Sequence, residues 1–204
     1  MGFNHRVEAE CARKLSEIFL EVIVAPGFSE EALGLLKKKK NLRLIEMKTG
    51  YIEESSVRSI QGGFIIQEKD NHTRETSEFE LKTSRKLTDN ERKDVSFGWR
   101  IIKYIKSNAI LIVKDQRILG VGAGQMSRID SVNIAVQKSG SSIRGSILLS
   151  DAFFPFSDSV VTASENGIVV VVEPGGSVRD DEVIEAAERS GISLLFTGMR
   201  HFLH

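Results

Sequence analysis

The spacing of apolar residues along the first third of the chain predicts alternating helices and short strands. Apolar positions at helical spacing over residues 8–19 predict an amphipathic helix. The continuous apolar run 22–25 ends at Pro26-Gly27, and a short β-branched run before such breakers is typical of a buried strand. Ser29 then predicts the N-cap of a second helix, and residues 42–45 predict a second strand.

The rest of the chain continues this alternation. Gly62-Gly63 lies between apolar segments and predicts a tight turn or a bulge, and Asp115-Gln116 predicts a hairpin turn. Further strands are predicted at 79–81, 109–113, 118–121, 147–149, 169–172 and 194–196. Further helices are predicted at 95–105, after Ser127, at 158–165 and at 179–189, with N-caps at Thr88 and Ser177. The pattern predicts an α/β fold in which helices cover both faces of a layered sheet.

Length and composition exclude several classes of protein. The chain has 204 residues, of which 41% are hydrophobic, enough for a sizeable core. Lys+Arg and Asp+Glu number 28 each, so the formal net charge is zero and no nucleic-acid partner is expected. The single cysteine, Cys11, excludes an internal disulfide and a multi-thiolate zinc site. Without a signal-like segment or an apolar run of membrane-spanning length, we expect a cytoplasmic protein and no membrane partner.

A glycine-rich stretch at 120–124 has some features of a dinucleotide-binding loop. The pattern fails because Gln125 stands three residues after Gly122, where a glycine is required. We favour a small-residue strand that another backbone approaches closely, with close approach of a ligand as the alternative. The acidic residues 180–182 are explained more simply by the first turn of a helix than by a metal site.

Two segments are hard to explain as an ordinary loop or an ordinary chain end. Residues 151–158 place three aromatic rings around a proline, between two acids and directly after a strand. Because open α/β sheets bind ligands beyond the carboxyl ends of their strands, a planar ligand would stack well there, although a hydrophobic plug fits equally. Residues 197–204 hold one arginine and two histidines, whereas chain ends are usually plain.

These two segments and the stretch 107–128 resemble a known enzyme family. Similar text runs through nearly the whole chain: FLEVIVAPGFSEEAL, LKKKKNLRLIE, SNAI, VGAGQMSR, SDAFFPFSD, VEPGGSVRDDEVI and TGMRHFLH. On these motifs the chain resembles the formyltransferase domain of the AICAR transformylase/IMP cyclohydrolase family. The resemblance implies a cytidine-deaminase-like layered α/β/α sheet, present twice in the domain and without the deaminase zinc. Residues 1–86 would then be a remnant of the first subdomain and residues 87–204 the complete second subdomain.

The same resemblance implies an activity and its partners. Members transfer a formyl group from the co-substrate 10-formyltetrahydrofolate to the 5-amino group of AICAR in purine (IMP) biosynthesis, and no metal takes part. They work as dimers with sites at the subunit interface. The expected partners are therefore AICAR, the folate, and either a second copy of this chain or a complementing N-terminal chain.

Site residues follow from the resemblance by position. The resemblance implies Asn108 beside the reacting centre and His204 as a supporting terminal histidine. The residues that it implies for AICAR are Glu21, Phe153 and Arg200, and those for the folate are Arg128, Ile129, Pro155, Phe156 and Asp158. Asp158 would accept pterin N–H groups, while Asn108 and Arg128 would donate to the oxyanion of the reaction.

The sequence departs from the family at the group that takes the amine proton. The family's Lys-His pair should lie well upstream of Glu8, and the sequence contains no Lys-His dipeptide. A Ser-x-Phe-Gly segment, a phosphate-binding arginine and the cyclohydrolase domain are missing as well. Since a general base typically contributes roughly a hundred- to ten-thousand-fold in rate, we expect little or no turnover from this chain alone.

Three hypotheses stay open at this stage. The first is a transformylase polypeptide whose other part is supplied by another chain or is not included in this sequence. The second is a non-catalytic folate- or nucleotide-binding remnant. The third is an unrelated α/β interaction domain.

Overall fold

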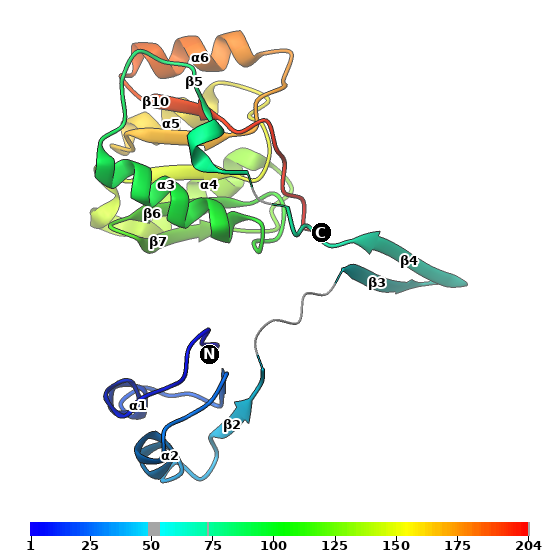
Figure 1. Ribbon diagram of the computed structural model, residues 1–204. Coiled ribbons are helices and arrows are strands. Elements are labelled where there is room, and N and C mark those ends of the chain that lie inside the picture. Colours follow the sequence, from blue (N-terminus) through cyan, green and yellow to red (C-terminus); the bar gives the residue numbers. More distant parts are fainter. Residues whose placement is uncertain (49–53, 73, 204) are drawn as a thin grey trace. The chain divides into compact units, whose positions relative to one another are not determined.

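The chain folds into two compact units, Met1–Lys69 and Asp70–His204. Figure 1 shows a computed structural model, which describes residues 1–48, 54–72 and 74–203. The sequence predicts a subdomain boundary near residue 86, but residues 70–86 pack on the second unit. Leu81 pairs there with Leu195 in the sheet, and Arg85 forms an ion pair with Glu91. The assignment of 1–86 and 87–204 to two family subdomains stays a prediction.

The first unit contains two small two-stranded sheets. Its elements are α1 (Ala9–Ser16), β1 (Val22–Ala25), α2 (Glu30–Leu36), β2 (Arg43–Glu46), β3 (Ser55–Ile60) and β4 (Gly63–Glu68). β1 and β2 pair in parallel and share a core with α1 and α2. The cap expected at Ser29 is confirmed, since its hydroxyl accepts from the Ala32 N–H at 3.3 Å. β3 and β4 form an antiparallel hairpin whose turn includes Gly62 at a φ of 84°, a value that suits glycine.

The second unit is built on one six-stranded mixed sheet. Its elements are η1 (Thr76–Glu78), β5 (Glu80–Leu81), α3 (Asp89–Ile102), β6 (Ile110–Lys114), β7 (Arg117–Gly122), α4 (Arg128–Ser139), η2 (Gly140–Ile143), β8 (Ile147–Ser150), α5 (Asp158–Glu165), β9 (Val170–Glu173), α6 (Asp180–Arg189) and β10 (Ser193–Phe196). The strand order is β5-β10-β9-β8-β6-β7, so β5 and β7 form the two edges. β8, β9 and β10 are parallel, whereas β6 is antiparallel to both of its neighbours.

Side chains of this sheet alternate between two helical layers. On β6, Ile110 and Ile112 join the core under α4, α5 and α6, whereas Leu111 and Val113 join the core under α3. This period of two is what a strand buried on both faces requires. The predicted α/β class, with helices on both faces of the sheet, is confirmed. The closer assignment to a cytidine-deaminase-like fold stays a prediction.

Two glycines of β7 let α4 pack directly on the strand. A Cβ atom added to Gly122 would lie 1.9 Å from the Ser131 carbonyl oxygen, and one added to Gly120 would lie 2.1 Å from that of Ala135. The helix backbone therefore fills the space that the small residues leave. Of the two interpretations of the glycine-rich stretch, close approach of another backbone is confirmed.

The starts of α3 and α6 test two predicted N-caps. The N-cap predicted at Thr88 is confirmed, because Thr88 and Glu91 form a capping box, and α3 therefore begins at Asp89, before the apolar stripe that starts at residue 95. α6 begins after Arg179 without a side-chain cap bond, so the N-cap predicted at Ser177 is wrong. The Ser177 hydroxyl instead accepts from the Arg179 N–H at 3.2 Å, which closes a local turn before the helix.

Candidate functional site

Several strand ends meet at one edge of the six-stranded sheet. β7, β8, β9 and β10 end at this edge, and β6 begins there because it runs antiparallel to β7 and β8. α4 also begins at this edge, with Ser127 as its N-cap. Since α/β sheets bind ligands beyond the carboxyl ends of their strands, this edge is the expected place for a site.

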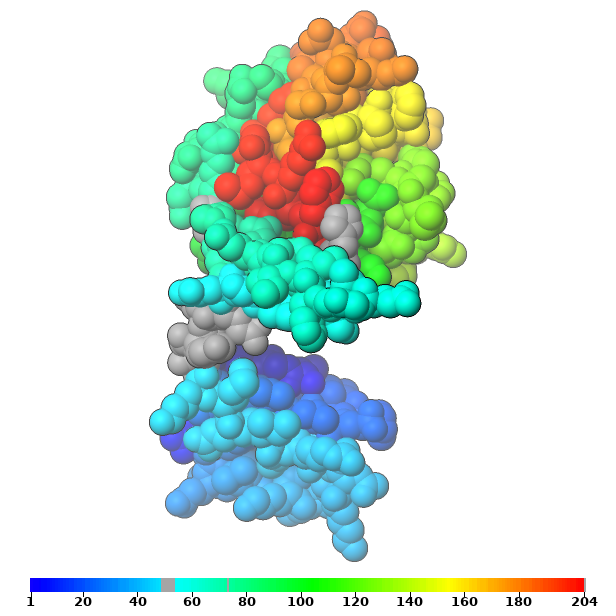
Figure 2. Space-filling model, turned by 90° about the vertical axis from the view of Figure 1, so that its right-hand side faces the viewer, coloured from blue at the N-terminus to red at the C-terminus, as the bar shows by residue number. Residues whose placement is uncertain are grey.

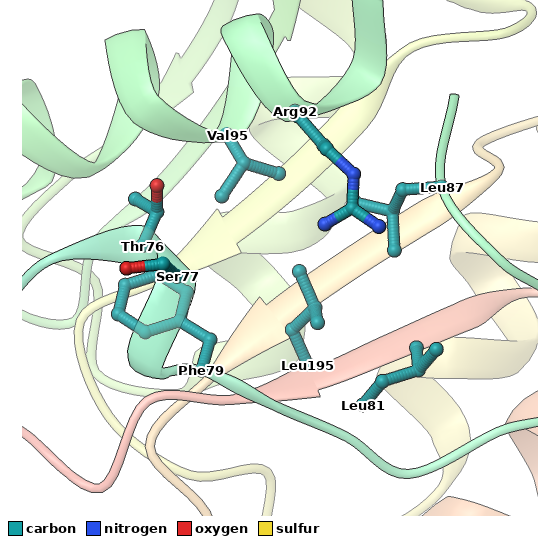
Figure 3. Close-up of a pocket in the computed structure, with 8 residues that line it drawn as sticks. All are labelled: Thr76, Ser77, Phe79, Leu81, Leu87, Arg92, Val95 and Leu195. Carbon is teal, nitrogen blue, oxygen red and sulfur yellow. The ribbon is translucent and has the colours of Figure 1, made fainter. Parts of the chain in front are cut away.

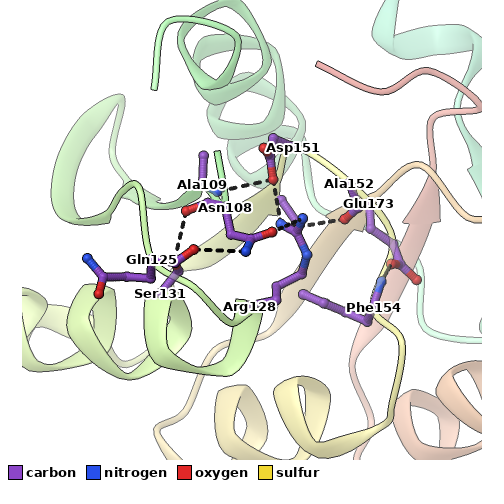
Figure 4. A network of polar contacts seen from close by, with 10 residues as sticks. Asn108, Ala109, Gln125, Arg128, Ser131, Asp151, Ala152, Phe154 and Glu173 are labelled. Atoms are coloured by element: carbon purple, nitrogen blue, oxygen red, sulfur yellow. Dashed lines mark hydrogen bonds and ion pairs between the residues drawn. The ribbon is translucent and has the colours of Figure 1, made fainter. Parts of the chain in front are cut away.

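Asn108 and Arg128, which we expect from the resemblance to donate to the oxyanion of the reaction, are in contact at this edge. Arg128 Nη2 donates to Asn108 Oδ1 at 2.8 Å, and Asn108 Nδ2 donates to the Gln125 carbonyl oxygen at 2.9 Å (Figure 4). The Ser131 hydroxyl donates to the Asn108 carbonyl oxygen at 2.8 Å. These contacts hold the Asn108 side chain in one orientation. An amide nitrogen carries two hydrogens, so a second donor remains for a ligand.

Arg128 is buried against Asp151, the first residue after β8. Arg128 Nη1 pairs with Asp151 Oδ1 and donates to the Ser150 hydroxyl at 3.0 Å. The same Asp151 oxygen accepts from the Ala109 N–H at 3.1 Å, and its other oxygen has no partner among the described residues. A buried guanidinium needs such a counter-charge, because an isolated ion is costly away from water. Asp151 therefore fixes Arg128, and Arg128 fixes Asn108.

Glu173, the last residue of β9, is a second buried carboxyl group near Arg128. Its Oε2 accepts from the Phe154 N–H at 2.5 Å, and its Oε1 has no partner among the described residues. Burial raises the pKa of Glu173 to about 8, with a further rise from the charge of Asp180. The Phe154 hydrogen bond and the Arg128 charge act in the opposite direction. At neutral pH the group is mostly protonated and holds the backbone of the aromatic segment.

The aromatic segment after β8 is partly a plug and partly accessible surface. Phe154 is fully buried in the core under α4, α5 and α6. Phe153 is half-buried, and the Arg200 guanidinium carbon lies 4.7 Å from its ring centroid. Phe156 is exposed, and the Arg179 guanidinium carbon lies 4.7 Å from its ring centroid. The segment is therefore a hydrophobic plug at Phe154 and an accessible aromatic surface at Phe153 and Phe156, each of which has a guanidinium group over its ring.

Other expected site residues lie in less constrained places. Pro155 and Asp158 are exposed, and an Asp158 oxygen accepts from its neighbouring Ser159 N–H at 2.7 Å. Ile129 is half-buried in the first turn of α4, against the core. Glu21 is exposed, lies just before β1 and belongs to the first unit.

The C-terminal tail lies against the candidate edge. Figure 2 shows the C-terminal residues, in red, on the surface of the second unit. The His201 N–H donates to the Asp151 carbonyl oxygen at 2.9 Å, and the Ser107 N–H donates to the Leu203 carbonyl oxygen at 2.7 Å. These bonds bring the exposed Arg200 to Phe153. His204 lies outside the described residues.

A separate pocket of about 200 Å³ opens between η1, β5, α3 and β10 (Figure 3). Phe79, Val95 and Leu195 form its apolar wall, and Arg92 is the only charged residue that lines it among those the structure describes. None of the expected site residues up to Arg200 lines this pocket. Its described lining residues also include no carboxylate or imidazole that would pair with Arg92 for proton transfer. The candidate site is therefore the strand-end edge.

Within residues 1–48, 54–72 and 74–203, no group of three or more His, Cys, Asp or Glu side chains is arranged to hold a metal ion. The Asp180 carboxylate accepts from the Gly176 and Ser177 N–H groups at 2.7 and 2.9 Å, a role suited to an acid at a helix start. In the same part of the chain, no helix has both the length and the apolar character needed to cross a membrane.

The second unit thus places buried polar residues and aromatic rings at the carboxyl edge of an α/β sheet, the edge at which such sheets bind ligands. The AICARFT/IMPCHase bienzyme family model matches residues 1–138. The chain is 43% identical over 204 residues to bifunctional purine biosynthesis protein PurH of Thermoanaerobacter sp. (strain X514). It is 49% identical over 207 residues to the protein of the same name in Desulfitobacterium hafniense (strain DSM 10664 / DCB-2). The chain therefore belongs to the AICARFT/IMPCHase bienzyme family.

The extent of these matches matters for function. Each of the two alignments covers 100% of this chain and 40% of the relative, so the chain spans about 40% of the length of the curated relatives that it matches. Among solved structures, the chain shows a weak likeness to Acinetobacter baumannii RibD, form 1, with a TM-score of 0.34 and 14% identity. That likeness covers 52% of this chain and 33% of the other.

Sequence reasoning missed three residues of this edge. From the sequence, Asp151 is expected only as an acid that flanks the aromatic rings, and Glu173 and His201 are not expected at the site. Asp151 directly follows a predicted strand, which is a usable signal. Glu173 also ends a strand, but nothing in the sequence indicates that its carboxyl group is buried. His201 contacts a residue 131 positions earlier, a pairing that no local pattern encodes.

Proposed function

We propose that this chain forms part of an AICAR formyltransferase, which transfers a formyl group from 10-formyltetrahydrofolate to the 5-amino group of AICAR in purine biosynthesis. The observation that carries the proposal is the cluster of half-buried Asn108 with buried Arg128 and Asp151 at the carboxyl edge of the sheet. Membership in the bienzyme family and the similarity to bifunctional purine biosynthesis proteins support it.

The reaction needs an acceptor site for a developing negative charge. The amine nitrogen of AICAR attacks the formyl carbon, whose oxygen becomes negatively charged in the tetrahedral intermediate. The C–N bond to the folate then breaks, and the folate nitrogen leaves with a proton while the amine loses one. In our proposal the unused N–H of Asn108 donates to that oxygen. Arg128 donates to Asn108, Ser150 and Asp151, so it keeps the amide in place.

The two substrates would lie on either side of this cluster. Phe153 offers an aromatic face to the AICAR base, and Arg200 offers a cation that has no ion-pair partner among the described residues. The resemblance assigns Glu21 to the ribose, and this residue belongs to the first unit. On the folate side, Phe156 and Pro155 offer an apolar surface, with Ile129 and Arg128 behind them. Asp158 is exposed and can accept hydrogen bonds from a pterin amide and amine.

The proposal requires a base that these 204 residues do not supply. They contain no Lys-His dipeptide, and His204 by itself only fits the role of a supporting histidine. A polypeptide segment that carries the missing pair would complete the site, and a second copy of this chain would share it, as the resemblance to dimeric enzymes implies. The same absence favours one alternative, a folate- or nucleotide-binding protein without catalysis. Binding without turnover in every mixture would support that alternative.

Calorimetry with AICAR and with a folate analogue tests the proposed substrate sides. Asp158→Asn should weaken binding of the folate analogue about tenfold or more, because ligand donors left unpaired cost roughly 1–3 kcal/mol. Binding of AICAR should change much less. Asp181→Asn, an exposed acid on α6, serves as the matched control. Equal losses for both ligands, or no loss for the folate analogue, would contradict the assignment of Asp158.

A further inference from the structure

One partly buried contact in the second unit joins the two ends of that unit. The His201 ring is 1% exposed, and its Nδ1 lies in hydrogen-bond contact with the carboxylate of Asp70, which is 131 positions earlier in the chain. Its Nε2 has no partner among the described residues. In the neutral tautomer that fits these contacts, Nδ1–H donates to the Asp70 carboxylate. The unpaired Nε2 is then an acceptor, not a buried donor. The contact is a charge-assisted hydrogen bond, which is among the stronger kinds in proteins.

The surroundings hold both partners in place. The Trp99 and His201 ring centroids lie 4.4 Å apart at an interplanar angle of 54°. Trp99 Nε1 in turn donates to the Arg74 carbonyl oxygen at 3.1 Å, so the ring beside His201 is fixed as well. Lys103 Nζ donates to the Asp70 carbonyl oxygen at 3.2 Å, at the end of α3. His201 is thus an anchor on the buried side of a chain end that would otherwise fray.

The anchor connects directly to the candidate site. The residue before it is Arg200, which stands over the ring of Phe153. The His201 N–H donates to the carbonyl oxygen of Asp151, the residue whose side chain holds Arg128. Two residues later, Leu203 accepts from the Ser107 N–H, next to Asn108. Any movement of His201 therefore moves Arg200 relative to both the aromatic segment and the Asn108–Arg128 pair.

We propose that Asp70 and His201 form a positioning pair that clamps the C-terminal tail to the strand-end edge and so presents Arg200 to the AICAR-class substrate. The pair itself does not touch the substrate and acts through Arg200. The inference rests on the proposed function for the identity of the substrate. The clamping of the tail does not depend on that identity, so the two claims can be tested apart.

Trypsin tests the clamp without any ligand. The enzyme cleaves after arginine, and release of residues 201–204 from the full chain reports opening of the tail at Arg200. With His201 buried and its N–H bonded, this release should be slow in the natural chain. Because cleavage follows the population of the open state, Asp70→Ala should speed release by about tenfold or more. Asp70→Asn, whose side-chain carbonyl can still accept from Nδ1–H, should restore most of the protection.

His72→Ala provides the matched control, since His72 is exposed and close to Asp70 in the sequence. It should leave the release of residues 201–204 unchanged. If Asp70→Ala does not fold, Asp70→Ser compared with Asp70→Asn makes the same test. Equal release rates in the natural chain, Asp70→Asn and the Ala or Ser variant would overturn the clamp.

Calorimetry then tests the link to the substrate. Asp70→Ala should weaken AICAR binding about tenfold and leave binding of a folate analogue within about twofold, with recovery of AICAR binding in Asp70→Asn. Equal losses for both ligands, in step with a lower melting temperature, would mean that the pair has a merely structural role and would overturn the positioning claim. If the natural chain binds no AICAR, the proposed function fails, while the trypsin result still decides the clamp.

Discussion

The two units of the chain differ in how completely they cover their strands. In the second unit, every residue of β8 and β9 is buried, and helices lie over both faces of the sheet. In the first unit, no residue of β4 is buried, and the Phe64 and Ile66 side chains are 72% and 69% exposed. A lone hairpin is marginal in water, and an exposed apolar surface is usually covered by other protein. The second unit is complete as a folded core, whereas the first is suited to packing against further polypeptide.

The candidate site follows the same division. The Asn108–Arg128–Asp151 cluster, the aromatic segment and the tail all belong to the second unit. From the first unit the resemblance implies only Glu21, and the Lys-His pair is absent from the sequence. We therefore expect the second unit to retain ligand binding, whereas turnover by the chain alone should be low. Three measurements can break or sharpen this comparison.

Turnover should show the largest effect. With AICAR and 10-formyltetrahydrofolate, this chain alone should be slower than a full-length relative by roughly a hundred- to ten-thousand-fold, because it lacks the group that takes the amine proton. Addition of a polypeptide that carries the preceding part of a relative's formyltransferase domain, including its Lys-His pair, should restore turnover. The same polypeptide with that histidine changed to alanine is the control. Ordinary turnover by the chain alone would show that the comparison is wrong.

A glycine substitution in each unit compares the packed β7–α4 contact of the second unit with the exposed β3–β4 hairpin of the first. Gly122→Ala should lower the free energy of unfolding by about 3 kcal/mol or more, since the new Cβ would meet the α4 backbone, which cannot move aside cheaply. Gly63→Ala in β4 has nothing within 4 Å of the new Cβ and should change stability by about 0.5 kcal/mol or less. Urea unfolding measures both, followed by the fluorescence of Trp99 for the second unit and by circular dichroism for the whole chain. Similar small effects would mean that β7 and α4 are not tightly packed.

The pH dependence of stability tests the buried acid of the second unit. Burial raises the pKa of Glu173 from 4.5 to about 8, so the unfolded chain releases this proton at lower pH than the folded chain. The contribution of this group to the free energy of unfolding is greatest below pH 4.5 and falls as the pH rises toward 8, by an amount on the order of 5 kcal/mol. Glu173→Gln keeps an acceptor for the Phe154 N–H and cannot ionise, so it should flatten this fall. Glu165→Gln, an exposed acid on α5, should leave the fall unchanged, and a fall that persists in Glu173→Gln would contradict the assignment.

Elements with strong local signals could be predicted from the sequence. α5 occupies Asp158–Glu165 as predicted, and the hairpin turn at Asp115 and Gln116 has the positive φ angles of 52° and 54° that such turns require. α3 shows the limit of apolar periodicity, because its first turn is polar and lies outside the apolar stripe 95–105, whereas the N-cap predicted at Thr88 marks the observed start. The capping residues Thr88 and Glu91, and not the apolar spacing, determine where this helix begins.

The candidate site could be predicted only in part. The segments that carry Asn108, Arg128 and Arg200 could be named from the family resemblance, but not the contacts that orient them. Arg128 depends on Asp151, which becomes its neighbour only when β8 lies beside β6. The raised pKa of Glu173 depends on burial by the surrounding elements, which no local pattern specifies.

The edges of the six-stranded sheet bear on the behaviour of the protein at high concentration. On β7 the register with β6 shifts at Ile112/Val113, and Lys138 Nζ donates to the Val121 carbonyl oxygen at 3.1 Å. At the other edge, β5 has only two residues. Bulges, lysines and very short strands at an edge all hinder strand addition by a neighbouring molecule. Aggregation through this sheet is therefore disfavoured, and the exposed β3–β4 hairpin is where intermolecular strand pairing would begin.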